Sequence, residues 1–425
     1  MPRLNILYAS TVYPPAIGGA QMHLHRLIGE MQRAGHSPRV VTHTSRYRRD
    51  WVRLSTVCCE PRLDYNYEGV PVSRLGFSPG RRLRMLPWAA AYYGCMGGAV
   101  RRLSRLIGDE LEPLAGRPAL VHATRIGREF LARAACEFAR RQLIPFVLTP
   151  NHHPRWRGWL YREYDRLYRE ADAVIALTAA EKDLLVDEKG VAADRIHITG
   201  VGPILADEFC AETFRRRFGI AERFVLYVGQ QLRYKGLAAV VEAAPMVWRR
   251  HGDVRFVFIG PPTPYSRRLF ERVPDRRLVN LGSVDLATKT SAIAACELLC
   301  LPSLQESFGG VFVEAWSHRK AVIGGRIAQV ASVIDEGVDG LLVNQNAGEL
   351  AAAIGRLLSD ADECQVMGEA GWRKVQQRYT WRQLAASTRD AYVAAGATLE
   401  AECLSQANRC EAGKPVTSDL RGGER

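Results

Sequence analysis

Two separate series of short apolar runs, each alternating with amphipathic helical patterns, constrain the fold of this chain more than any other feature. The first series comprises runs at 4–10, 38–44, 119–124, 144–150 and 172–178. The second comprises runs at 223–229, 254–260, 277–282, 297–303, 320–325 and 340–343. Helical patterns between the runs, such as 20–35 and 128–142, indicate parallel sheets with helices on both faces. The sequence therefore predicts an α/β protein with two doubly wound parallel-sheet domains, which also suits a length of 425 residues.

The boundary between the two series is a turn-rich segment at 200–212 that lacks any apolar periodicity. We place the N-terminal domain at 1–205 and the C-terminal domain at 206–376. The final stretch, 406–425, is polar and carries Gly, Lys, Ser and Asp, so we expect it to be disordered.

The net charge of +13 is distributed unevenly along the chain. Residues 1–170 contain 27 Arg and no Lys against 13 acidic residues, whereas the remaining residues are close to neutral. The excess lies in stretches that mix Arg with Trp, Tyr and Leu, at 45–53, 80–88, 101–106 and 154–169. Such mixtures suit an anionic membrane surface, although a solvated surface in an Arg-rich proteome explains them equally well. We expect no nucleic-acid partner, because no nucleic-acid-binding motif accompanies the charge.

Apolar runs, the N-terminal sequence and the cysteines indicate where in the cell the protein is located. No apolar run reaches the roughly 20 residues that a membrane-spanning helix needs, and the N-terminus lacks a signal-peptide pattern. The ten cysteines form no CxxC pair, which favours reduced thiols and argues against a zinc site. We therefore expect a cytoplasmic protein, with peripheral attachment to the inner face of the plasma membrane as an open alternative.

The stretch 301–316, LPSLQESFGGVFVEAW, contains the clearest candidate site. A strand ends near Ser303, and we expect a helix with Ser307 as its N-cap, whose free amides would bind a phosphate. Adjacent glycines cost about 1 kcal/mol each inside a helix, so Gly309 and Gly310 suggest that a diphosphate lies against bare backbone. Glu306 and Glu314 would then accept hydroxyl hydrogen bonds on either side. Alternatively, Glu306 only complements the helix dipole and Glu314 lies on a solvated face.

Two more strand ends contribute candidates. VLYVG is followed by QQLRYKG, which places Arg233 and Lys235 where a cation could stabilise a diphosphate leaving group. The first predicted strand is followed by Gly18 and Gly19 without a full GxGxxG, which argues against a dinucleotide-binding oxidoreductase.

Together these segments resemble the retaining glycosyltransferases of family 4. The resemblance spans most of 4–395 and includes the N-terminal GG, EADAVIALT, VGQQLRYKG, VNLGSV and DGLLV. Its specific part is the pattern E-x-F-G-x-x-x-x-E within PSLQESFGGVFVEA. The resemblance implies the GT-B fold, two Rossmann-like domains that face each other across a cleft. It further implies that the segment 377–405 contains a helix that crosses back to the N-terminal domain.

Roles for individual residues follow from the same resemblance. Glu306 would contact the transferred sugar, Glu314 the nucleotide ribose and Lys235 the diphosphate. Gly309 and Gly310 would supply backbone contacts, with Gly19 opposite them, and Val284 would lie near the base. The donor site would also include Gln230, and the donor would be a nucleoside diphosphate sugar, with no further cofactor and no metal ion. Asp360 and Asp362, the only Asp-x-Asp, are expected to form a turn or cap.

The chain departs from the family pattern at several positions. Gln230 replaces the usual Arg, for which Arg233 can substitute, and Thr124 replaces the second His of a His-x-His that begins at His122. Nearby polar groups could take over, so we add His122 and His152 to the catalytic candidates Glu306, Lys235 and Arg233. The acceptor-binding candidates are Arg125, Arg128, His153 and Arg155.

The sequence therefore predicts a retaining glycosyltransferase that acts on a lipid-linked or saccharide acceptor in polysaccharide or glycolipid assembly. Two alternatives remain open at this point: a nucleotide-sugar epimerase, and a catalytically silent protein of the same fold that binds a sugar nucleotide.

Overall fold

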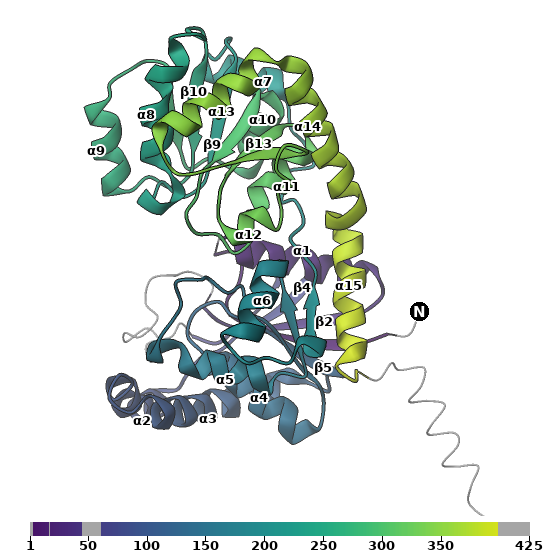
Figure 1. Cartoon of the computed structure of the whole chain (residues 1–425). Helices are drawn as coiled ribbons and strands as arrows, with labels where there is room; N and C mark the ends of the chain where they lie inside the picture. Colours follow the sequence, from purple (N-terminus) through teal and green to yellow (C-terminus); the bar gives the residue numbers. More distant parts are fainter. Residues whose placement is uncertain (1–2, 17, 45–60, 398–425) are drawn as a thin grey trace, which may run out of the picture.

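The computed structural model describes residues 3–16, 18–44 and 61–397. These residues form two α/β domains, which Figure 1 shows one above the other. The basic stretch 45–53 and the tail 406–425 lie outside the described residues. Eight strands form the first sheet in the order β3-β4-β2-β1-β5-β6-β7-β8. Their bounds are Asn5–Val12 (β1), Ser37–Thr44 (β2), Leu63–Tyr67 (β3), Val70–Arg74 (β4), Leu120–Thr124 (β5), Phe146–Thr149 (β6), Ala173–Ala176 (β7) and Ile196–Ile198 (β8).

The prediction of a parallel sheet is confirmed except at one edge. β3 pairs with β4 in an antiparallel hairpin, and every other pair in the sheet is parallel. The hairpin turns at Glu68 and Gly69, which both have positive φ. Sequence reading missed this hairpin because β3, LDYNY, is short, polar and largely exposed.

Helices cover both faces of this sheet. Their bounds are Gly19–Arg33 (α1), Pro79–Ala90 (α2), Met96–Ala115 (α3), Phe130–Gln142 (α4), Arg162–Glu170 (α5) and Ala179–Asp187 (α6), with 3₁₀ turns at Trp159–Tyr161 (η1) and Ala193–Arg195 (η2). Local chemistry fixes several ends: Thr178 caps α6 by accepting a hydrogen bond from the Glu181 amide, and Leu143 ends α4 in the left-handed region.

Six parallel strands form the second sheet in the order β11-β10-β9-β12-β13-β14. Their bounds are Phe224–Val228 (β9), Arg255–Ile259 (β10), Leu278–Gly282 (β11), Leu298–Leu301 (β12), Ala321–Gly325 (β13) and Gly340–Val343 (β14). The helices around it are Ala211–Phe218 (α7), Leu237–Trp248 (α8), Pro264–Arg272 (α9), Leu286–Ala295 (α10), Gly310–Ser317 (α11), Ala328–Ala331 (α12), Ala347–Ser359 (α13) and Ala361–Lys374 (α14), and a 3₁₀ turn, η3, covers Arg233–Lys235.

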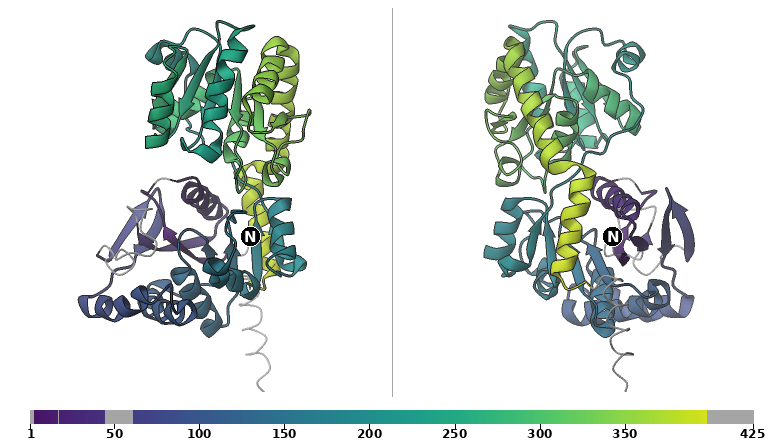
Figure 2. Two further views of the ribbon diagram at one scale, coloured as in Figure 1. Left: turned by 60° about the vertical axis from the view of Figure 1, so that its left-hand side comes forward. Right: turned by 90° about the vertical axis from the view of Figure 1, so that its right-hand side faces the viewer.

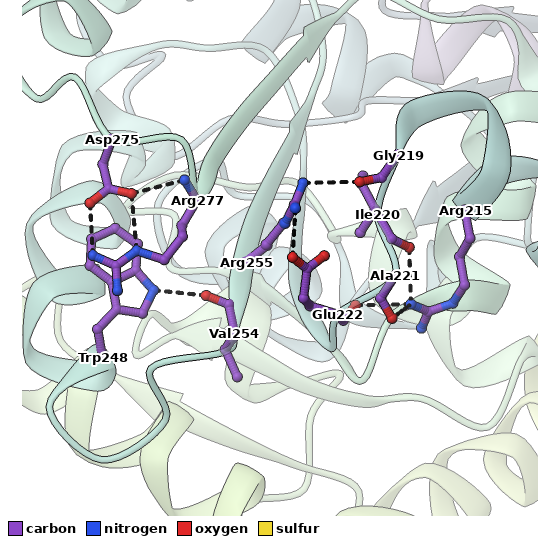
Figure 3. Close-up of polar contacts among 10 residues, drawn as sticks. All are labelled: Arg215, Gly219, Ile220, Ala221, Glu222, Trp248, Val254, Arg255, Asp275 and Arg277. Atoms are coloured by element: carbon purple, nitrogen blue, oxygen red, sulfur yellow. Dashed lines mark hydrogen bonds and ion pairs between the residues drawn. The ribbon is translucent and has the colours of Figure 1, made fainter.

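Arginines near the amino ends of strands in this second sheet bind to neighbouring segments (Figure 3). Arg277, just before β11, stacks on the Trp248 ring at 3.6 Å and pairs with Asp275. Arg255, at the start of β10, pairs with Glu222 at 2.6 Å. These contacts stabilise the edge of the sheet where the strands begin, and they do not involve the carboxyl ends of the strands.

The chain returns to the first domain through one long helical segment. α14 continues through a π-helical stretch, Val375–Tyr379 (η4), into α15 (Trp381–Ala394), and α15 packs beside α1 and β7 (Figures 1 and 2). Asp360 caps α14, as expected for a cap. The linker between the domains passes close to this crossing, since the Trp381 indole donates a hydrogen bond to the Pro203 carbonyl at 2.9 Å. Gly200 and Gly202 leave room there for the rings of Tyr379 and Trp381.

Candidate active site between the two domains

The loops that follow β9 and β12 are joined by a backbone hydrogen bond and by close packing, and these contacts bring together two of the predicted residues. The Tyr234 carbonyl accepts from the Leu304 amide at 2.8 Å, and Gly236 has φ 82° and packs directly against Pro302. As a result the Lys235 ammonium lies 2.5 Å from a Glu306 carboxylate oxygen. Both side chains are mostly buried, at 15% and 10% exposure. The pair can offer a cation to a phosphate and a carboxylate to a hydroxyl within one small region.

Glu314 lies in the middle of α11 and has a partner that sequence reading missed. The Lys289 ammonium, on α10, contacts Glu314 Oε1 at 2.7 Å and also donates to the Ile204 carbonyl of the interdomain linker at 2.9 Å. Glu314 is buried, so it does not lie on a solvated face. Burial raises the pKa of its carboxyl group, and Lys289 opposes that rise. No spacing in the sequence indicates this pair, because its members come from different helices.

The structure corrects the expected start of this helix. Gly309, with φ 91°, is the N-cap of α11, and the Ser307 hydroxyl instead donates to the Asn151 carbonyl of the other domain at 3.3 Å. A Cβ atom on Gly309 would lie 2.5 Å from the Phe312 ring, and one on Gly310 would lie 3.3 Å from Val201. Contacts within the chain therefore account for both glycines, and their predicted contact with a diphosphate stays a prediction.

The loop 151–156 of the N-terminal domain faces these residues across the domain boundary. The Arg155 guanidinium lies 5.4 Å from the centre of the Tyr234 ring, and the His153 ring meets the same ring edge-on at 6.4 Å. Burial, with Arg155 and Lys235 nearby, lowers the pKa of His153 to about 4. The structure thus brings His153 and Arg155 to the same place as Lys235 and Glu306, although the sequence separates them by at least 80 residues.

Arg125 is not available to an acceptor, in contrast to its predicted role. Its guanidinium is buried between the Trp156 ring at 4.1 Å and the Tyr164 ring at 4.2 Å, and it donates to His152 Nδ1 at 3.1 Å. Through His152 and Trp156, Arg125 stabilises the 151–156 loop. Sequence reading placed this arginine correctly after a strand but could not show that downstream aromatic rings close over it.

His122 and His152 are also held in the interior. His122 is bonded at both ring nitrogens, to the Tyr392 hydroxyl at 2.7 Å and the Thr149 hydroxyl at 2.8 Å, so it links the sheet to α15. Thr124 bonds to the Ser10 hydroxyl in the neighbouring strand. The His152 side chain is buried within the 151–156 loop, and burial lowers the pKa of both histidines to about 3. His122 therefore has a structural place, while His152 contributes through the loop that carries it.

The remaining predicted site residues have few contacts with the residues described above. Arg233 is exposed above the Tyr265 ring at 5.3 Å, and Gln230 is exposed at the end of β9. Gly19 opens α1, and a Cβ there would meet no atom within 4 Å. Val284 is partly buried after β11, and Arg128 stacks on the Tyr92 ring at 5.2 Å. Their contacts with a ligand stay predictions.

The 151–156 loop is anchored by a buried carboxylate that the sequence did not single out. Glu181 of α6 accepts hydrogen bonds from the His152 amide at 2.5 Å and from the Leu177 amide at 2.7 Å. Burial is the largest influence on this carboxyl group and raises its pKa from 4.5 to about 7, against the two amide bonds and Arg125, which lower it.

Glu181 should make stability depend on pH. Since its pKa is higher in the folded state than in the unfolded one, its contribution is fully present below about pH 4.5 and is lost as the pH rises through about 7. We expect the free energy of unfolding to fall by up to about 3 kcal/mol over that interval from this group alone. Glu181→Gln should show a shallower slope in chemical denaturation at several pH values, whereas Asp187→Asn, an exposed change on the same helix, should keep the slope. Equal slopes in all three proteins would contradict this account.

Comparisons with known proteins agree with the two-domain arrangement. The family model described as "Glycosyl transferase 4-like domain" matches residues 18–202, and the model described as "Glycosyl transferases group 1" matches residues 222–360. Among solved structures, HepE of Anabaena in complex with UDP and glucose superposes with a TM-score of 0.68 at 17% identity, over 91% of this chain and 98% of its own. Sucrose-phosphate synthase from Thermosynechococcus elongatus superposes with a TM-score of 0.69 at 18% identity, over 91% and 98%. These likenesses show the GT-B fold.

Curated relatives are similar over part of their length. Alpha-D-kanosaminyltransferase of Streptomyces kanamyceticus is 31% identical over 47% of this chain and 55% of its own. Phosphatidyl-myo-inositol mannosyltransferase of Mycolicibacterium smegmatis is 34% identical over 46% of this chain and 51% of its own. The matches thus span about half the length of these relatives. With the two family matches and the fold, the chain belongs to the group 1 glycosyltransferases of GT-B fold.

Proposed function

We propose that this protein transfers a sugar from a nucleoside diphosphate donor to an acceptor hydroxyl, with retention at the anomeric carbon. The observation that carries the proposal is the Lys235–Glu306 pair at the domain boundary, with Arg155 and His153 opposite it. A diphosphate sugar offers phosphate oxygens to Lys235 and sugar hydroxyls to Glu306, so one ligand can satisfy both members of the pair.

The proposed reaction needs little covalent chemistry from the protein. The bond between the anomeric carbon and the diphosphate oxygen breaks, the acceptor oxygen bonds to that carbon on the same face, and the leaving diphosphate takes the acceptor's proton. Lys235, Arg233 and the free amides at the start of α11 stabilise the negative charge that develops on the diphosphate. The scheme uses no cofactor beyond the donor and draws its positive charge from these groups rather than from a metal ion.

Glu314 and Lys289 support the assignment of the nucleotide end. The Glu314 carboxylate is held in place by Lys289, and its oxygens can accept a hydrogen bond from a ribose hydroxyl. HepE, which shares the fold, was solved with UDP and with UDP-glucose, and this makes UDP-sugars a natural starting point for a screen.

The test is a thermal-shift and product screen against UDP-, GDP- and ADP-sugars, with simple alkyl glycosides and lipid-linked saccharides as acceptors. We expect one donor class to raise the melting temperature and to release nucleotide, and we expect NMR to show a product that keeps the donor's anomeric configuration. An epimerised sugar nucleotide without acceptor would favour an epimerase. Binding without turnover across all acceptors would favour a silent sugar-nucleotide-binding protein.

A further inference from the structure

Helix α2 carries an apolar stripe that points into water. Leu83, Leu86, Pro87 and Ala90 follow the spacing i, i+3, i+4, i+7, and all four are exposed, Leu83 by 69%. Met85, on the opposite side, is the one fully buried residue of this helix. An amphipathic helix normally turns such a stripe toward the core, so this one is available to an external apolar phase.

Arginines flank the apolar stripe, and the sequence from the start of α2 to the middle of α3 contains no acidic residue. Residues 79–106 contain six Arg and no Asp or Glu. Arg84 on α2 and Arg101 and Arg102 on α3 are exposed, and none of the three forms an ion pair with another described residue. At about 100° per residue, Arg82 and Arg84 lie on either side of the stripe. Apolar side chains between rows of arginine suit the boundary between lipid head groups and acyl chains.

Two exposed aromatic side chains lie in the segments that follow α2 and precede α5. Tyr93, 51% exposed, lies in the turn after α2, and Trp159, also 51% exposed, begins η1. The two segments adjoin, because Gly97 at the start of α3 lies against Glu163 of α5. Tyr92, next to Tyr93, donates to Glu129 at 2.6 Å, and Arg128 donates to Tyr92. Trp159 follows the 151–156 loop by three residues, so this segment links the neighbourhood of α3 to the loop that carries His153 and Arg155.

We propose that the docking face formed by Leu83, Leu86, Tyr93 and Trp159 lies in the head-group region of an anionic bilayer, and that the acceptor is a lipid-linked molecule drawn from that bilayer. The second part rests on the proposed glycosyl transfer. Charge favours a bilayer over a second copy of this chain, since a two-fold contact through α2 would place arginines against arginines. Within the described residues no helix has the length and apolarity to cross a membrane.

Sedimentation with vesicles tests the docking face. We expect the full chain to bind vesicles of phosphatidylcholine with about 30% phosphatidylglycerol more tightly than phosphatidylcholine alone, and binding should weaken as NaCl rises from about 0.1 to 0.5 M. The double variant Leu83→Ser/Leu86→Ser should lose at least about tenfold in vesicle affinity. Leu143→Ser is the matched control: this leucine is 93% exposed near the end of α15, away from α2, and its loss should leave binding unchanged.

Three outcomes would overturn the docking face. They are equal binding to neutral and anionic vesicles, wild-type vesicle affinity in the double variant, and a concentration-dependent dimer that the double variant abolishes. Donor binding in vesicle-free buffer separates this proposal from the previous one. We expect the double variant to bind sugar nucleotide like the wild type, whereas a protein that binds vesicles but no sugar nucleotide would refute the glycosyl transfer and leave the docking face intact.

Discussion

Replacing Lys235 with alanine is expected to reduce turnover by about 10²–10³-fold, with a smaller change in the apparent KM for the donor. The reason is that the charge on the leaving diphosphate grows as the glycosidic bond breaks, so a cation beside it stabilises the transition state more than the ground state. Initial rates of nucleotide release measure the effect, once the screen has identified the donor.

Two further variants sharpen this experiment. Lys235→Arg keeps the charge but changes the geometry beside Glu306, and we expect it to recover only part of the lost rate. Arg267→Ala removes an exposed cation on α9 in the same domain and should leave the rate unchanged. Turnover by Lys235→Ala at the wild-type rate would contradict the role given to this lysine.

Removing Lys289 is expected to destabilise the protein more than removing both members of its pair. Lys289→Met leaves the buried Glu314 carboxylate without its cation, at a cost of about 2–4 kcal/mol in the free energy of unfolding. Glu314→Gln/Lys289→Met removes the uncompensated charge and should regain most of that loss. Chemical denaturation of the two single variants and the double variant measures the coupling.

The pH dependence of this loss provides a second check. Because burial raises the pKa of Glu314, the carboxyl group is protonated more easily in the folded protein and then needs no cation. The defect of Lys289→Met should therefore be larger at pH 8 than at pH 5. An equal defect at both pH values, or a double variant as unstable as Lys289→Met, would show that the ion pair does not carry the effect.

Much of the fold could be predicted from local patterns. Eleven apolar runs were predicted as strands and all are present, since a run buried on both faces of a sheet stands out from its surroundings. The β3–β4 hairpin and the short β8 were missed because they have few apolar residues. The proximity of Lys235 and Glu306 followed from a general rule, since both follow strands whose carboxyl ends meet at one edge of a sheet, and β9 and β12 are in fact neighbours.

The errors have a common physical cause. Ser307 was expected to cap α11 because its residue type suits a cap, but Gly309 takes that position while Ser307 reaches the other domain. Arg125 was expected to face an acceptor, but Trp156 and Tyr164 enclose it. In both cases the contacting residues lie far away in the sequence. A local sequence pattern cannot predict such contacts.

The amino-acid sequence by itself determined the two doubly wound domains, the loops at their strand ends and the residue types that a nucleoside diphosphate sugar would need. Periodicity, turn residues and buried runs act over a few residues, so they can be read directly. The tertiary structure alone decided that Lys289 holds Glu314, that Glu181 anchors the loop of His153 and Arg155, and that α2 turns its apolar stripe outward. Burial and pairing depend on which distant segments meet, and that is settled only when the domains pack.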